Sequence, residues 1–194
     1  MRLARLLSIH RHASRRFLRR EGGNAVVEGV LLLPILLWAA FGLYVFWDGY
    51  KVSNKLQKAT YTVADIASRW QAVPLASTDV RGMQDLMEYM ISEGDEPRLR
   101  MTSVIWVEDQ NRFEVRWSCS MDPVTLPAYT TATLQLVADR IPETADGATQ
   151  IIVESEYDFA PLFDNGIEAM TFREFVPVRP RFEAVTFSDP GACN

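Results

Sequence analysis

The feature that most constrains this sequence is an apolar segment of 24 residues, from Asn24 to Trp47, with one charged residue, Glu28. About 20 apolar residues are enough for a helix to cross the hydrocarbon core of a bilayer. The segment is longer than the apolar core of a cleaved secretory signal, which covers roughly 7–15 residues, and no polar region follows it. It therefore predicts a single transmembrane helix over residues 24–47, with Trp38 and Trp47 as anchors in or near the membrane interface.

Charge is distributed unevenly on the two sides of this segment. Residues 1–23 hold seven arginines and one acidic residue, whereas residues 48–194 hold 13 lysines and arginines against 23 aspartates and glutamates. Because positively charged flanks stay in the cytoplasm, this pattern predicts a cytoplasmic N-terminus and an exported acidic domain. A basic arm that binds nucleic acid is the disfavoured alternative, and we expect no nucleic-acid partner.

Apolar periodicity continues the helix beyond the membrane, over residues 48–73. Apolar residues recur there every three or four positions, which is the spacing of a single helical stripe. The stripe consists of Val52, Leu56, Ala59, Val63, Ile66 and Trp70. A helix from residue 24 to about residue 70 would be ~70 Å long. Pro34 removes a helical hydrogen bond, so we expect kinks at Pro34 and Gly42, and Pro74 ends the helix.

Residues 74–194 are expected to form a small α+β domain. Its predicted elements are a helix capped by Ser77 or Thr78, strands at Leu99–Val107, Arg112–Ser120 and Ile151–Phe159, a short helix within 130–142, and a last strand within 172–187. Pro177 and Pro180 confine that last strand to a sheet edge or split it. Helices followed by a meander of antiparallel strands predict an α+β fold, in which a long N-terminal spine helix packs against a small antiparallel sheet.

Both cysteines, Cys119 and Cys193, follow the apolar segment. In the strand Arg112–Ser120, Phe113, Val115, Trp117 and Cys119 alternate with polar residues, so Cys119 is predicted to point inward. An exported pair of cysteines can form a disulfide in the oxidising periplasm. The alternative is two buried free thiols that lie too far apart to be bridged.

Catalytic chemistry has little to build on in this chain. The only histidines, His10 and His12, lie in the arginine-rich segment, which excludes a histidine base or zinc ligand from the exported part. Glu154, Glu156 and Asp158 share one face of a predicted strand. A calcium site or an acid pair is the alternative there, but the spacing favours the solvated face of a strand, because a glycosidase pair must face each other across a cleft. We therefore expect no enzyme activity, no metal and no cofactor.

Glu28 is costly in a membrane helix, by roughly 2.5–3.5 kcal/mol at the centre and less near the end. Cleavage after Gly23 would make Asn24 the first residue and Glu28 the fifth. A basic leader ending in glycine, a glutamate at mature position five and an apolar helix resemble the type IV pilin signature. The resemblance implies cleavage by a prepilin peptidase on the cytoplasmic side, and pairing of Glu28 with the free amine of a neighbouring subunit.

Three stretches narrow the resemblance: RREGGNAVVEGVLLLPILL, SEYDFAPLF and VRPRF. They look like the TadE/TadF/TadG group, the pseudopilins or minor pilins of tight-adherence (Tad) pili. The matching later positions are Tyr157, Asp158, Phe159, Pro161, Leu162 and Arg179, Pro180, Arg181. Gly29 follows the glutamate where the major Tad pilin typically has tyrosine, which favours a TadE-like or TadF-like minor component. The resemblance implies a pilin-like fold, partnership with other Tad pilins through the N-terminal helix, and an inner-membrane protein that enters or primes an adhesive pilus.

Two other functions stay open. The first is an uncleaved single-pass anchor that carries a periplasmic binding module, with Glu28 in the cytoplasmic headgroup region. The second, an anchored hydrolase that uses Glu154 or Glu156, is the least favoured.

Overall fold

The computed structural model describes residues 24–71, 73–92, 95–163, 167–189 and 193. In chain order, their elements are α2 (Asn24–Ser68), α3 (Ser77–Ile91), β1 (Arg98–Val107), η2 (Glu108–Gln110), β2 (Arg112–Ser120), α4 (Thr131–Leu134), η3 (Gln135–Arg140), β3 (Thr149–Phe159) and β4 (Met170–Val178). The chain divides into two compact units, and the boundary lies within α2, between Val45 and Phe46. The predicted α+β class, with a long N-terminal helix and a small antiparallel sheet, is confirmed.

The sheet in residues 46–194 has the strand order β2-β1-β3-β4, and each neighbouring pair is antiparallel. β4 is an edge strand and contains Pro177, opposite Ile152 of β3. Proline cannot donate a backbone hydrogen bond, and an edge position tolerates this loss. The edge placement predicted from Pro177 is confirmed, and β4 ends before Pro180.

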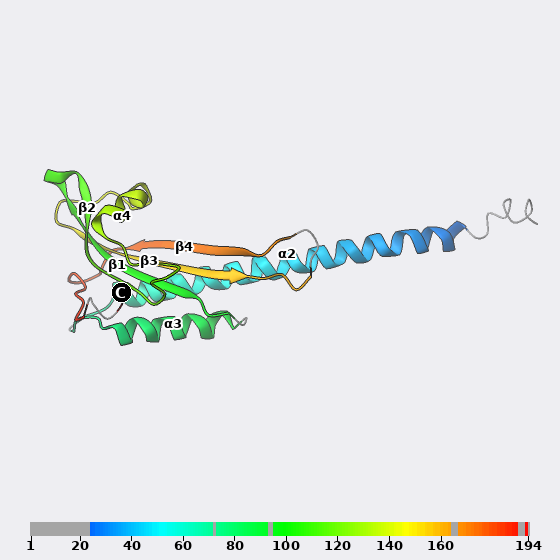
Figure 1. The fold of residues 1–194 in the computed structure, drawn as a ribbon, viewed down its shortest axis with the longest axis horizontal. Coiled ribbons are helices and arrows are strands. Elements are labelled where there is room, and N and C mark those ends of the chain that lie inside the picture. Colours follow the sequence, from blue (N-terminus) through cyan, green and yellow to red (C-terminus); the bar gives the residue numbers. More distant parts are fainter. Residues whose placement is uncertain (1–23, 72, 93–94, 164–166, 190–192, 194) are drawn as a thin grey trace, which may run out of the picture. The chain divides into compact units, whose positions relative to one another are not determined.

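Helices α2 and α3 cover one face of the sheet (Figure 1). The stripe on α2 is buried as predicted: Val52, Leu56, Ala59 and Val63 are at most 1% exposed, and Ile66 and Trp70 are partly buried. α3 contributes its own apolar face, which includes Met87. Within this layer, the hydroxyls of Thr60 and Ser155 lie 2.5 Å apart and join α2 to β3. The second half of α2 is therefore part of the core of the α+β unit.

The opposite face of the sheet carries a second, smaller core beneath α4 and η3, which includes Leu134 and Ile152. At a register shift within β2, the alternating side chains of the strand change from one face of the sheet to the other. Ser103 of β1 pairs with Trp117, but the next residue of β1 pairs with Val115, so Arg116 is the extra residue of a β-bulge. Trp117 packs in the first core and Phe113 in the second. The prediction that the alternating residues of β2 share one face is wrong, although Cys119 is buried as expected.

One predicted detail of the helices, the capping residue of α3, is wrong. α3 begins at Ser77, but its N-cap is Ala76, and the Asp79 carboxylate accepts the Ala76 N–H at 2.8 Å. A carboxylate in the first turn serves here in place of a hydroxyl cap. The predicted short helix within 130–142 is present, as the α-helix α4 followed directly by the 3₁₀ helix η3.

The C-terminal segment closes the end of the unit at which α2 leads into α3. The backbone of Leu75 pairs with this segment, accepting from Ser188 N–H at 2.9 Å and donating to Thr186 O at 2.8 Å. Trp117 Nε1 donates to Val185 O at 2.8 Å, and its ring lies 5.0 Å from the ring of Phe187. These contacts hold the segment against both the sheet and the helix pair.

Candidate functional site

The N-terminal part of α2 presents an apolar surface on all sides. Its large apolar side chains between residues 26 and 44 are 47% to 70% exposed. Exposed apolar area on this scale is unfavourable in water and marks a surface that another apolar phase covers. α2 is long and apolar enough to cross a membrane once, which is consistent with single-pass anchoring.

Glu28 lies in this surface, one helical turn after the first residue of α2, Asn24. Its side chain is exposed, and it is the only charged residue between residues 24 and 47. Within the described residues it has no cationic partner. The predicted cleavage site joins Asn24 to Gly23, and Gly23 lies outside the described residues. An unpaired carboxylate on an apolar helix can accept a cation or an ammonium group from outside the chain.

Pro34 and Gly42, the predicted kinks, both lie within the uninterrupted helix α2. A Cβ atom added to Gly42 would meet no atom within 4 Å. The helix therefore continues through both residues, and a bend at either of them stays a prediction.

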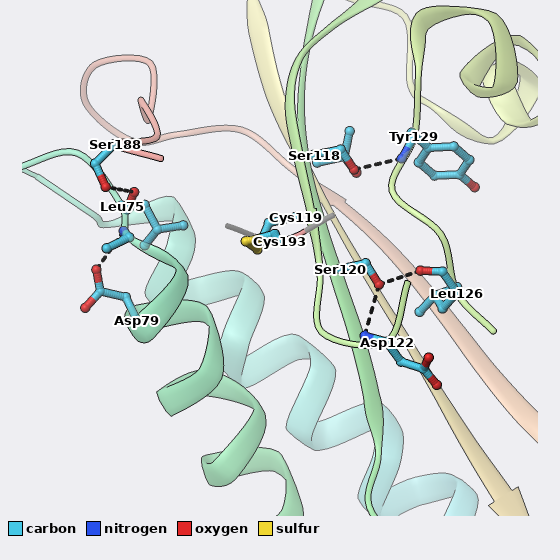
Figure 2. Close-up of a disulfide and its surroundings, with 12 residues drawn as sticks. Leu75, Asp79, Ser118, Cys119, Ser120, Asp122, Leu126, Tyr129, Ser188 and Cys193 are labelled. Carbon is cyan, nitrogen blue, oxygen red and sulfur yellow. Dashed lines mark hydrogen bonds between the residues drawn. A yellow bond between two sulfur atoms is a disulfide. The ribbon is translucent and has the colours of Figure 1, made fainter. Parts of the chain in front are cut away.

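Cys119 and Cys193 lie together as a disulfide, with their Cα atoms 4.8 Å apart. Figure 2 shows the bond between β2 and the helices, near Leu75 and Ser188, which connect α3 to the C-terminal segment. Both cysteines are buried in the first core. The predicted pairing is thus present, and it fastens the C-terminal segment to the sheet across 74 residues of sequence.

Glu154, in the middle of β3, is part of a buried ion pair on the second face of the sheet. Its carboxylate accepts Arg100 Nε–H at 2.8 Å and the Tyr129 hydroxyl at 3.1 Å. The Arg100 guanidinium lies 3.7 Å from the centre of the Tyr129 ring and also donates to Pro127 O. Glu154 is only 7% exposed, so the prediction of a solvated face is wrong at this position, because Tyr129 and Arg100 cover it.

The pKa values of this cluster reflect its burial. Burial raises the pKa of Glu154 above its usual value, and the nearby Arg100 opposes that shift. Burial and the adjacent carboxylate raise the pKa of Tyr129 to about 12, so the phenol stays protonated and donates a hydrogen bond to Glu154. The arrangement holds the charges of β1 and β3 in a charge-assisted hydrogen bond.

Glu156 and Asp158 continue the same stripe toward the end of β3. Arg98 donates to Asp158 at 2.6 Å and to Glu156 at 3.3 Å, and Arg173 of β4 donates to Glu156 at 2.8 Å. Hydrogen bonds from Arg98 and from Thr171 lower the pKa of Asp158 to about 2. Each carboxylate therefore has a cation on a neighbouring strand, which stabilises the pairing of three strands.

Sequence reasoning missed the partners of these carboxylates, Arg98, Arg100 and Tyr129. A signal for two of them was present, since Arg98 and Arg100 are two residues apart in a predicted strand, as Glu154 and Glu156 are in another. Equal spacing on two paired strands lets both ion pairs form at once. Tyr129 lies in a loop and leaves no comparable signal.

Among the hollows of the unit that starts at Phe46, two are lined entirely by residues that the structure describes. A cleft of about 530 Å³ separates the end of α2 from the C-terminal segment, and its lining residues are Trp70, Gln71, Val73, Pro74 and Phe182–Thr186. A smaller one of about 210 Å³ is lined by Asp48, Val52, Asp95 and Tyr157–Ala160. Across the residues that the structure describes, no group of three or more His, Cys, Asp or Glu side chains is placed to hold a metal ion.

Comparison with known proteins finds no matching family model, no matching curated protein and no matching solved structure. The functional conclusion therefore depends on the apolar part of α2, on Glu28 and on the domain built around the rest of the helix.

Proposed function

We propose that this chain is a minor pilin or pseudopilin of a Tad-type pilus, processed by a prepilin peptidase and acting in pilus assembly, priming or surface adhesion. The observation that carries the proposal is the double use of α2. Its N-terminal part is exposed and apolar and bears one carboxylate, whereas its C-terminal part lies in the core of an α+β domain. A subunit that leaves the membrane and bundles with others through a helix needs both properties in a single element.

Glu28 has a defined role in this proposal. In the membrane, an exposed carboxylate near the end of the span is tolerated at a moderate cost. When helices bundle, the free amine of Asn24 on a neighbouring processed subunit supplies a cation to it, and pairing in an apolar surrounding is strong when both groups are hydrogen-bonded. The glutamate therefore sets the axial position of one subunit against the next.

The proposed processing is tested by the intact mass of the protein, expressed with and without the prepilin peptidase of its host. We expect a chain that begins at Asn24 only when the peptidase is present. The Gly23→Ala variant should remain full-length, whereas Gly29→Ala should be processed normally, because Gly29 lies beyond the cleavage site and a Cβ there does not disturb the helix. A full-length chain under both conditions would overturn the pilin assignment.

The proposed role of Glu28 is tested by replacing it with Ala and, as a matched variant of similar size, with Gln. Both variants should be cleaved, since the change lies beyond the cleavage site, and both should fail to enter pili because they lack the charge. Pilus incorporation is measured by immunoblotting of sheared surface fractions. Normal incorporation of Glu28→Ala would exclude the pairing role while leaving processing intact.

The second candidate function is an uncleaved, membrane-anchored binding module. The observation that favours it is the cleft beside Trp70 and Phe182, which lies in the domain and not in the span. The same mass measurement separates the two functions, because the anchored module keeps residues 1–23 in the presence of the peptidase.

A further inference from the structure

We propose that the chain rests on the lipid headgroup surface where β3 ends and β4 begins, through a membrane-contact patch made of Leu162, Phe163 and Met170. The partner is a zwitterionic lipid surface, the outer side of the bilayer that α2 crosses. The inference rests on the membrane span of the proposed function, but not on its processing or on pilus assembly.

β3 runs along α2 toward the apolar segment. Ser155 contacts Thr60, with 2.5 Å between the two hydroxyl oxygens. Four residues later, Phe159 lies against Gly49, where an added Cβ would be 3.4 Å from Phe159 Cε1. β3 therefore runs opposite to α2 and approaches the apolar segment as its residue numbers rise. Figure 1 shows this end of β3 and the start of β4 lying beside each other along the helix.

A strand and a helix advance by different distances per residue along their axes. An extended chain advances about 3.3 Å per residue and a helix 1.5 Å, so each residue of β3 passes about two residues of α2. Ala160 and Asp48 already line the same small hollow. The chain therefore leaves β3 at the level of Asp48, which directly follows Trp47, the last residue of the predicted span.

Exposed apolar side chains gather at this end of the unit. Leu162, Phe163 and Met170 are 69%, 41% and 44% exposed, and Met170 lies opposite Phe159 in the sheet register. On α2, Trp47 and Tyr50 are exposed at the same end of the unit. Single exposed apolar residues are ordinary on protein surfaces, but apolar and aromatic side chains gathered at the end of a membrane span are typical of an interface.

Charge limits the depth of this contact. Asp158 and Glu168 are close to the patch in sequence and both are exposed, so the patch lies at the headgroup level and does not enter the hydrocarbon. Asp158 already has Arg98 as its partner at 2.6 Å, which reduces its repulsion from lipid phosphates. A contact at this level would fix the tilt of the domain on the membrane before any assembly.

The test uses the full chain in phosphatidylcholine vesicles, with photoreactive p-benzoylphenylalanine in place of Leu162. The matched controls are Leu36, which is 66% exposed in the span, and Leu136, which is 83% exposed on η3. The segment around Leu136 packs on the first residues of β2, where Gln135 Nε2 donates a hydrogen bond to Phe113 O at 2.8 Å. Lipid adducts are counted by mass spectrometry after irradiation, and an intact disulfide on non-reducing gels shows that each variant is folded.

We expect lipid adducts at Leu36 and Leu162 and about tenfold fewer at Leu136. Adducts at Leu36 alone would overturn the membrane-contact patch and leave the span. Covalent dimers from Leu162 without lipid adducts would overturn it in favour of a second copy of the chain. Absence of adducts at Leu36 would overturn the span itself, and with it the proposed function, whereas an uncleaved chain that still gives lipid adducts at Leu162 would retain this inference.

Discussion

The two halves of α2 belong to one helix but have sequences adapted to different surroundings. Up to residue 44, large apolar residues cover the whole circumference and stay exposed, while from Val52 onward they form a single stripe that is buried against the sheet and α3. A helix that is apolar all round is suited to lipid, and one with an apolar stripe is suited to a water-facing domain. The change from one pattern to the other occurs where Asp48 and Lys51 introduce the first charges after Glu28.

The largest effect is expected from removing the disulfide, which acts only on the unit that holds the second half of α2. The bond spans 74 residues, and a loop of that length corresponds to about 4 kcal/mol in the chain-entropy model. The Cys119→Ser, Cys193→Ser variant should lose that much stability. Thermal unfolding of the full chain in detergent, followed by near-ultraviolet circular dichroism, measures it. An unchanged midpoint would mean that the C-terminal segment is held by its other contacts alone.

A matched pair of leucines compares the two halves directly. Leu56 is fully buried and Leu36 is 66% exposed, so Leu56→Ala leaves a cavity and should cost about 3 kcal/mol of domain stability. Leu36→Ala should leave the stability of the domain unchanged. The same unfolding measurement serves for both variants. Equal losses would show that the first half is also packed within the domain.

Two glycines sharpen the comparison further. Gly49 faces Phe159, whereas a Cβ at Gly42 meets nothing within 4 Å. Gly49→Leu should therefore force the helix and sheet apart and cost about 1–3 kcal/mol. Gly42→Leu should leave the domain midpoint where it is. A tolerated leucine at Gly49 would contradict the close approach of α2 to β3.

The smallest effect is expected from changing a charge. The domain carries several charged side chains along β3, whereas the first half of α2 carries only Glu28. The pKa of Asp158 is lowered to about 2 by its hydrogen bonds with Arg98 and Thr171, below the ordinary value of about 3.9. Its stabilising contribution is present above pH 4 and is lost as the pH falls toward 2. Because the side chain is half exposed, the contribution is small.

The measurement is the unfolding midpoint between pH 5 and pH 2 for the parent and for Asp158→Asn. The variant should show a shallower decrease over this range. Asp85→Asn, at an exposed position of α3, is the matched control and should follow the parent. Identical slopes for all three proteins would remove Asp158 from the acid sensitivity of the domain.

Periodicity and length were enough to predict most of the fold. The continuation of α2 beyond residue 47, all four strands and the edge position of β4 follow from apolar spacing and from the prolines, because these signals are local. The disulfide could be favoured over two free thiols because both cysteines follow the predicted membrane span. Glu28 could be singled out because a lone charge within an apolar run carries a cost, which is largest at the centre of a membrane span.

The rest depends on contacts between distant strands. The bulge at Arg116 reverses which residues of β2 face each core, and nothing in the alternation of β2 itself indicates the extra residue. The burial of Glu154 depends on Arg100 and Tyr129, which are 54 and 25 residues away in sequence. A strand face can be identified as polar from sequence, but its partners and burial are set by the neighbouring strands and loops.

The position of Cys193 has a consequence for the order in which the domain can be closed. Its partner Cys119 is on β2, and β3 and β4 lie between the two in the chain. In a chain synthesised from its N-terminus, Cys119 emerges before Cys193 and cannot form the native bond during that interval. The bond can close only after β3 and β4 have been synthesised. Disulfide formation thus reports that the chain has been extended through all four strands of the sheet.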